Sequence, residues 1–110
     1  MEEYTVKLTA EASKDMEQIY DYIAWSLLAP ESALNQYNRI AEAVLSLNQM
    51  PERCPLFDCE PEHSRGIHKM IIDNYTVCYI IDNSKKEVFV LAVLYGASDI
   101  HSRLQNRQGR

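Results

Sequence analysis

The chain has 110 residues, of which 46% are hydrophobic and 25% are charged, and its formal net charge is −5 at pH 7. This length suits one compact domain, this composition argues against a disordered protein, and no apolar stretch approaches the roughly 20 residues of a membrane-spanning helix. Residues 1–62 carry 12 acidic and 4 basic side chains, whereas residues 63–110 carry 4 acidic and 7 basic ones. So small a basic surface argues against tight, nonspecific binding to nucleic acids.

The N-terminal region predicts a strand followed by an amphipathic helix. Residues 4–9 alternate between apolar and polar side chains, which is typical of a half-buried strand. Thr9 is a suitable N-cap for the helix that follows. The apolar stripe of this helix is formed at helical spacing by Ala12, Met16, Ile19, Ile23 and Leu27. Residues 1–4 show neither the basic nor the apolar part of a secretory signal, so we expect a cytoplasmic protein.

A second helix is predicted directly after a short connection at residues 28–31. Pro30 suits the first turn of this helix, and Pro51 disfavours helix at Met50, so the helix ends there. The short connection implies that the two helices form an antiparallel hairpin. The apolar stripe of the second helix is formed by Ala33, Tyr37, Ile40, Val44 and Leu47.

The second half of the chain predicts a loop and three strands. Residues 51–65 contain three prolines and little periodicity, which indicates a loop. Strand patterns follow at residues 67–72, 75–81 and 88–95, and the last is apolar throughout, as in a strand that is buried on both faces. A short helical turn at residues 98–104 precedes a tail at residues 105–110 that we expect to be disordered. The predicted fold is α+β, in the order β-α-α-β-β-β, with a small, mainly antiparallel sheet and a helical hairpin packed on one face, and residues 1–110 form a single domain.

The order and spacing of these segments resemble the RelE/ParE superfamily of toxins from type II toxin–antitoxin systems, and more closely its ParE branch. The resemblance covers nearly the whole chain and is carried by residues 4–9, 19–24, 43–47, 50–53, 65–79 and 93–99. It implies the fold described above, inhibition of growth, and a cognate antitoxin that wraps around the toxin. ParE toxins are associated with inhibition of DNA gyrase without known catalytic residues, whereas ribosome-dependent relatives cut mRNA.

Two positions argue against mRNA cleavage. Cleavage needs a base, an acid and a cation that stabilises the charged phosphate intermediate. Thr76 stands where ribosome-dependent relatives tend to carry an arginine, and Ser98 stands where ParE-like relatives often have one. The sequence therefore favours a toxin that is not an enzyme. The alternatives are a ribosome-dependent mRNA endoribonuclease of RelE type and a detoxified family member that acts only as a binding module.

A remnant catalytic site would have to use other residues of the C-terminal half. Its candidates are Arg65, His68, Tyr95 and His101. Arg65 could bind a phosphate or an antitoxin carboxylate, or it could be a solvated loop residue. Tyr95 could act as an acid or a base, but a core-capping role is the better interpretation.

The remaining candidate residues are those expected to contact an anion or a partner protein. Contacts with an anion or with the target are expected at Arg65, Lys69 and Arg103. Asp99 could pair with Arg103 four residues later. The antitoxin is expected to contact Tyr20, Trp25, Tyr79 and Phe89. The second face of the strand at residues 88–95 also needs a cover, which an antitoxin or a second copy of the chain in a homodimer could supply.

The cysteines and histidines could suggest a metal site. Cys54, Cys59, His63 and His68 are ligand types that zinc accepts, but their spacing matches no common zinc motif. Cys78 lies in an apolar strand and is best interpreted as a small buried side chain. We therefore expect no metal and no cofactor.

Overall fold

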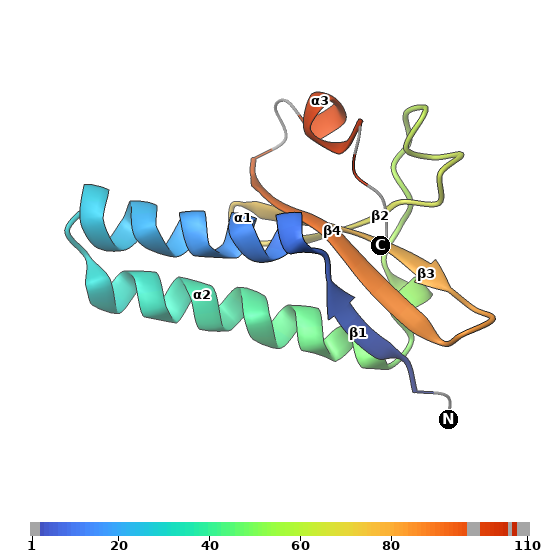
Figure 1. The fold of residues 1–110 in the computed structure, drawn as a ribbon, viewed down its shortest axis with the longest axis horizontal. Coiled ribbons are helices and arrows are strands. Elements are labelled where there is room, and N and C mark those ends of the chain that lie inside the picture. Colours follow the sequence, from blue (N-terminus) through green and yellow to red (C-terminus); the bar gives the residue numbers. More distant parts are fainter. Residues whose placement is uncertain (1–2, 97–99, 106, 108–110) are drawn as a thin grey trace.

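The structure, a computed structural model, describes residues 3–96, 100–105 and 107 (Figure 1). The elements are β1 (Thr5–Leu8), α1 (Ala10–Asp21), a π-helical segment (Tyr22–Ser26), α2 (Pro30–Leu45), β2 (His68–Ile72), β3 (Tyr75–Asp82), β4 (Glu87–Tyr95) and α3 (Ile100–Leu104), with short 3₁₀ segments at Ser46–Asn48 and Pro51–Arg53. The predicted order and the α+β class are confirmed, and each strand end lies within one residue of its predicted position. Within the described residues, no helix is long and apolar enough to cross a membrane.

The four strands form one sheet in the order β1-β4-β3-β2. The pairs β2–β3 and β3–β4 are antiparallel, as expected for strands joined by short turns. β1 runs parallel to β4, with Thr5 opposite Glu87, an arrangement that the long connection through the helical hairpin permits. The sheet is therefore mainly antiparallel with one parallel edge strand.

The helical hairpin packs on one face of the sheet and forms the larger core. The Thr9 side chain accepts a hydrogen bond from the Ala12 backbone nitrogen at 3.1 Å, which caps the start of α1. From α1 and α2, the buried residues of this core are Ala12, Met16, Ile40 and Val44, and from the sheet they include Val77, Tyr79, Val88 and Val90. The apolar stripes that the sequence predicted for the two helices thus face the sheet along most of their length.

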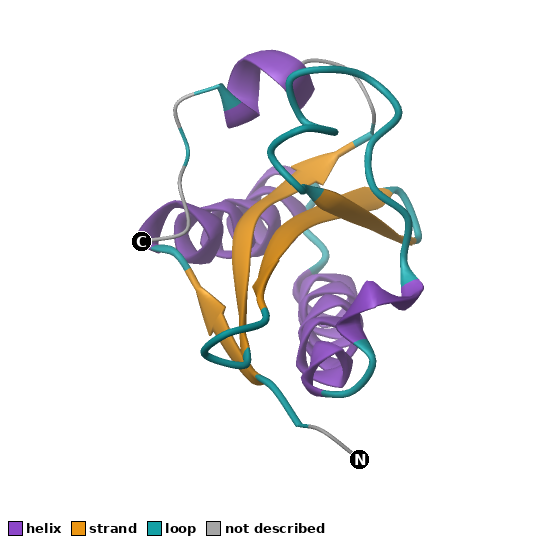
Figure 2. Cartoon of the chain, turned by 90° about the vertical axis from the view of Figure 1, so that its right-hand side faces the viewer, coloured by secondary structure: helices purple, strands orange, loops and turns teal. Residues whose placement is uncertain are grey.

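The opposite face of the sheet is covered by the chain itself. A second cluster joins Ile67, Cys78, Leu91, Ala92 and Leu94 to Ile100 and Leu104 of α3. Figure 2 shows α3 at the top of the molecule, above the sheet, with α2 at the lower right. The prediction that β4 is buried on both faces is confirmed, and the cover is the C-terminal helix in place of a partner protein.

The apolar stripe of the first helix ends earlier than predicted. Leu27 is 57% exposed, because α1 changes to the wider π-helical segment at Tyr22 and the residues that follow rotate away from the sheet. The loop end of the hairpin also extends past the sheet (Figure 1). Consequently Trp25 and Leu28 are 74% and 81% exposed. In α2, Tyr37 is likewise at the surface and not in the core.

Candidate functional site

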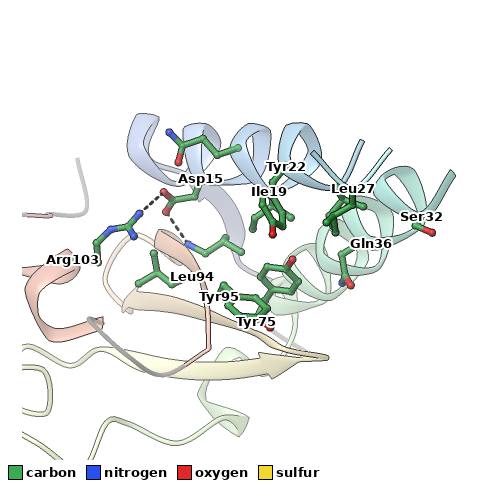
Figure 3. Close-up of a pocket in the computed structure, with 13 residues that line it drawn as sticks. Asp15, Ile19, Tyr22, Leu27, Ser32, Gln36, Tyr75, Leu94, Tyr95 and Arg103 are labelled. Atoms are coloured by element: carbon green, nitrogen blue, oxygen red, sulfur yellow. Dashed lines mark hydrogen bonds and ion pairs between the residues drawn. The ribbon is translucent and has the colours of Figure 1, made fainter. Parts of the chain in front are cut away.

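A groove of 630 Å³ lies between the helical hairpin and the end of the sheet where β3 begins and β4 finishes (Figure 3). One wall comes from α1, the π-helical segment and the start of α2, and the other from β3, β4 and α3. The lining residues are Asp15, Gln18, Ile19, Tyr22, Ile23, Leu27, Ser32, Gln36, Tyr75, Val93, Leu94, Tyr95 and Arg103. The groove exists because the hairpin extends past the sheet and leaves its inner face uncovered there.

The middle of the groove is aromatic and apolar. Tyr75 and Tyr95 lie opposite each other on β3 and β4, and their rings meet edge-on with centroids 5.4 Å apart. Tyr95 is 69% exposed, whereas Tyr75 is buried, and its burial raises the pKa of the Tyr75 hydroxyl. Together with Ile23 these rings form a surface that suits apolar side chains of a partner. Tyr95 therefore lies at the edge of a contact surface as well as at the end of a strand.

One end of the groove contains a buried carboxylate. Asp15 is 4% exposed, and its Oδ2 accepts hydrogen bonds from the Val93 backbone nitrogen at 3.0 Å and from Arg107 Nη1 at 2.6 Å. The Arg107 guanidinium also donates to the Leu91 carbonyl oxygen at 3.0 Å. The hydrogen bond to Asp15 raises the pKa of Arg107. Asp15 thus fixes α1 to β4 and holds residue 107 against both.

Arg103 supplies the exposed positive charge at this end. Its Nη2 lies 3.6 Å from Asp15 Oδ1, and its side chain is 48% exposed. Figure 3 shows Arg103 pointing toward Asp15 from α3. Because Arg107 already makes the short hydrogen bonds with Asp15, the Arg103 donors remain available to an incoming anion. The position of Arg103 is therefore compatible with the predicted contact to an anion.

Arg65 is placed differently from both interpretations of the sequence. Its guanidinium donates to the Leu104 carbonyl oxygen at 2.8 Å and to the Arg107 carbonyl oxygen. These are carbonyls at and beyond the end of α3, which a cationic side chain can cap. Arg65 is therefore a structural tie between the loop before β2 and the C-terminal segment, and it does not line the groove.

His68 and Tyr79 form a second structural contact away from the groove. Their rings stack with centroids 5.1 Å apart, and His68 Nδ1 lies 2.8 Å from the Cys54 carbonyl oxygen. The Tyr79 hydroxyl donates to the Pro51 carbonyl oxygen at 2.5 Å, and burial raises the pKa of this hydroxyl. Tyr79 has no exposed surface, so the expectation that it contacts the antitoxin is wrong for the chain in this conformation.

The remaining candidates are also dispersed. His101 is 60% exposed at its side chain, and its Nδ1 lies 2.8 Å from Glu62 Oε2, which belongs to a buried carboxylate. Lys69 lies over the Phe57 ring, 5.5 Å from its centroid. Of the four catalytic candidates, only Tyr95 lines the groove. The structure thus does not bring Arg65, His68, Tyr95 and His101 together.

Thr76 has a structural role at the position where an arginine would serve cleavage. It is 7% exposed, and its hydroxyl donates to the Gly96 carbonyl oxygen at 3.2 Å. Ser98 and Asp99, and with them the predicted pair between Asp99 and Arg103, lie outside the described residues. Among the described residues, no group of three or more histidine, cysteine or acidic side chains could hold a metal ion.

The comparison with known protein families identifies the chain. The family described as "ParE toxin of type II toxin-antitoxin system, parDE" matches residues 6–100. The chain belongs to this family. It is a type II toxin of the RelE/ParE superfamily, as the sequence predicted. No curated protein matches it.

Three solved structures share the fold of this ParE family member. The chromosomal ParDE system from P. aeruginosa has a TM-score of 0.70 at 24% identity, over 86% of this chain and 97% of that one. The complex RelBE2 from Mycobacterium tuberculosis has a TM-score of 0.61 at 21% identity, over 84% and 98%. A mutant of E. coli toxin RelE in the free state has a TM-score of 0.63 at 15% identity, over 92% and 93%. At these identities the similarity shows a common fold.

The other residues expected to contact an antitoxin lie on separate surfaces. Trp25 is exposed two residues after the groove residue Ile23 but does not line the groove, whereas Tyr20 meets Tyr37 on another face of the hairpin, at a centroid distance of 6.3 Å. Phe89 is half-buried on β4 under Lys7 Nζ, which lies 5.9 Å from its ring. For these residues, contact with an antitoxin stays a prediction.

Sequence reasoning missed Asp15 and Arg107. The predicted apolar stripe of the first helix does not include Asp15, although Asp15 directly precedes Met16 and follows Ala12 by three residues, so it shares their buried face. That spacing is the signal that could have found it. Arg107 falls in the tail expected to be disordered, and this expectation is wrong for Arg107, because Asp15 binds it. No local pattern indicates that contact.

Proposed function

We propose that the chain inhibits growth by binding a protein target, DNA gyrase, and that a cognate antitoxin neutralises it by placing a segment in the groove described above. The observation that carries the antitoxin part is the groove itself, which has an apolar and aromatic middle and the exposed Arg103 at one end. Such a surface suits an amphipathic segment with an acidic residue opposite Arg103. The gyrase part is supported by membership of the ParE family and by the dispersed positions of the nuclease candidates.

The first test is controlled expression in a tightly repressed bacterial host, with and without the protein encoded next to this gene. We expect growth arrest that the neighbouring protein relieves, and inhibition of supercoiling by purified gyrase. Unchanged growth would indicate a detoxified family member that acts only as a binding module. New mRNA ends mapped by primer extension, with gyrase unaffected, would favour a ribosome-dependent nuclease and would contradict the gyrase target.

The position of the antitoxin is tested with two exposed leucines of the hairpin. Leu27 lines the groove and is 57% exposed, whereas Leu45 is 63% exposed and lies outside this groove. We expect Leu27→Asp to weaken antitoxin binding by about tenfold or more, since it places a charge in an apolar contact, and Leu45→Asp to change it by less than about twofold. Equal effects in isothermal titration calorimetry would place the antitoxin elsewhere.

A further inference from the structure

A second groove, of 390 Å³, follows the other side of the helical hairpin. Its walls are Glu17, Tyr20 and Asp21 of α1 and Leu34 and Tyr37 of α2. None of these residues lines the groove next to the sheet. On a helix, positions 17, 20 and 21 lie on a different face from positions 15, 19 and 23, which face the sheet-side groove. The two grooves can therefore be occupied independently.

The base of this second groove is aromatic. The Tyr20 and Tyr37 rings meet edge-on, at an interplanar angle of 88°, so the flat faces of the two rings point in different directions within the groove. Leu34 is 51% exposed beside them. An aromatic surface next to an aliphatic one suits the long carbon stem of a basic side chain, and the face of a tyrosine ring attracts its cationic end.

Two carboxylates stand at the edge of the aromatic pair. Glu17 and Asp21 are both exposed and are four residues apart on α1, so their charges repel each other along the helix. No basic side chain among the described residues pairs with either of them. By contrast, Asp15 is paired with Arg107 and Asp73 with Arg39. The groove therefore combines an aromatic base with unneutralised negative charge.

We propose that this second groove binds an arginine side chain from a basic segment of a partner protein. A guanidinium is planar, so it can stack on a tyrosine ring while its edge donates two parallel hydrogen bonds to a carboxylate. Such an occupant would also relieve the repulsion between Glu17 and Asp21. The site does not depend on the proposed function, because an antitoxin in the sheet-side groove would leave it open.

A second copy of the chain is the less suitable occupant. Four of the five arginines that the structure describes are hydrogen-bonded within their own chain: Arg39 to Asp73, Arg53 to backbone carbonyls, Arg65 to the end of α3, and Arg107 to Asp15. The fifth, Arg103, lines the sheet-side groove and lies 3.6 Å from Asp15. An arginine of another protein meets no such competition. The chemistry of the groove and the state of the chain's own arginines thus agree on a basic partner segment.

The test uses the peptide acetyl-Arg-Leu-Arg-amide and nuclear magnetic resonance of the full chain with labelled tyrosine rings. We expect saturable shifts of the Tyr20 and Tyr37 ring signals, with a dissociation constant of about 1 mM, as suits a contact of a few side chains. The peptide acetyl-Glu-Leu-Glu-amide should cause none. Absence of saturable shifts with the basic peptide, or shifts confined to Tyr75 and Tyr95, would overturn the proposal.

Charge variants separate a specific site from a general attraction. Glu17→Gln with Asp21→Asn removes the two carboxylates of the groove, whereas Glu31→Gln with Glu42→Gln removes the same charge from exposed positions of the same hairpin. We expect the first pair to weaken peptide binding by about fivefold or more and the second by less than about twofold. Equal weakening in two variants with unchanged circular dichroism would show that net charge alone attracts the peptide.

Discussion

Asp15 and Arg107 are 92 positions apart in the sequence, and their side chains meet at 2.6 Å in the structure. Their side chains are only 4% and 12% exposed, so the pair lies mostly out of water. A buried charge that loses its partner is strongly destabilising, whereas loss of both partners is less so. This pair therefore ties residue 107 to α1 and to β4, and its Asp15 lines one end of the proposed antitoxin groove.

The first prediction concerns the energy of this pair. Arg107→Gln leaves the Asp15 carboxylate without its closest cation, so we expect the free energy of unfolding to fall by about 3 kcal/mol. Asp15→Asn should lower the free energy of unfolding by a similar amount, and the double variant should lower it by less than the sum of the two single effects. Urea unfolding of the four proteins measures the coupling. The exposed pair of Arg39 and Asp73 is the control, and a coupling there as large as in the buried pair would contradict the interpretation.

The second prediction uses Cys78 to report on the cover formed by α3. Cys78 is fully buried and packs in the cluster that includes Ile100 and Leu104. In a chain with Cys54 and Cys59 replaced by serine, we expect slow labelling of Cys78 by a thiol reagent. Arg65→Gln removes the hydrogen bonds to the end of α3 and should raise the labelling rate about tenfold. This rate corresponds to a loss of about 1.4 kcal/mol from the free energy that keeps α3 packed over Cys78.

The control for this experiment is Arg39→Gln, which alters an exposed contact between α2 and the β2–β3 turn. Labelling at the rate of the unaltered chain is expected for this variant. If Arg65→Gln and Arg39→Gln behave alike, α3 does not control access to Cys78.

These contacts show where sequence reasoning succeeds and where it stops. The apolar patterns at residues 4–9, 12–27, 33–47 and 88–95 report local burial, and they predicted the first and last strands, the hairpin and a β4 that is buried on both faces. The parallel pairing of β1 with β4 and the bond between Asp15 and Arg107 depend on long-range packing, and the order of the elements does not specify them. The exposure of Leu27 escaped prediction because one π-helical turn changes the helical period.

Some residues of the candidate site could likewise be found from the sequence, and others could not. Tyr95 and Arg103 could be found because a residue at the end of a strand, or on a helix that follows it, lies near the sheet edge. Arg65 and His68 were chosen without knowledge of their internal partners, and both are engaged by backbone carbonyls of distant segments. A cation in the sequence is therefore a weak indicator of a site until its internal partners are known.

The third prediction concerns alkaline pH. Burial raises the pKa of the Cys78 thiol from 9.0 to about 12. The unfolded chain therefore releases this proton at lower pH than the folded chain, so the stabilisation is complete below pH 9 and is lost as pH rises toward 12. One such group lowers the free energy of unfolding by up to about 1.4 kcal/mol per pH unit.

Urea unfolding between pH 8 and pH 10 compares the unaltered chain with Cys78→Ala. The variant is expected to be less stable at all pH values but to lose stability less steeply above pH 9, since it lacks the buried thiol. Parallel curves would show that the thiol does not contribute. Tyr79, whose pKa burial also raises, should add to the decline in both proteins above pH 10.

The fourth prediction concerns Trp25, which is the single tryptophan of the chain and is 74% exposed. Its fluorescence should resemble that of a solvated indole in the free protein and should shift to shorter wavelength when the antitoxin binds. Trp25→Ala is expected to weaken antitoxin binding by about tenfold or more, because tryptophan is enriched among the residues that dominate the binding energy of protein interfaces, with a change in stability within about 0.5 kcal/mol. An unshifted spectrum at saturation would place Trp25 outside the interface.

The last prediction concerns Arg103 and salt. Arg103 is half-exposed at the end of the groove, and its distance of 3.6 Å from Asp15 leaves its donors available. Arg103→Gln should slow association with an acidic antitoxin segment several-fold at low ionic strength, because charges at the rim of an interface act mainly on the rate of encounter. The difference should shrink as added salt screens the charges, over a Debye length of about 10 Å at 0.1 M salt. Arg39→Gln removes an equal charge far from the groove, and an equal effect on the association rate would contradict a specific role for Arg103.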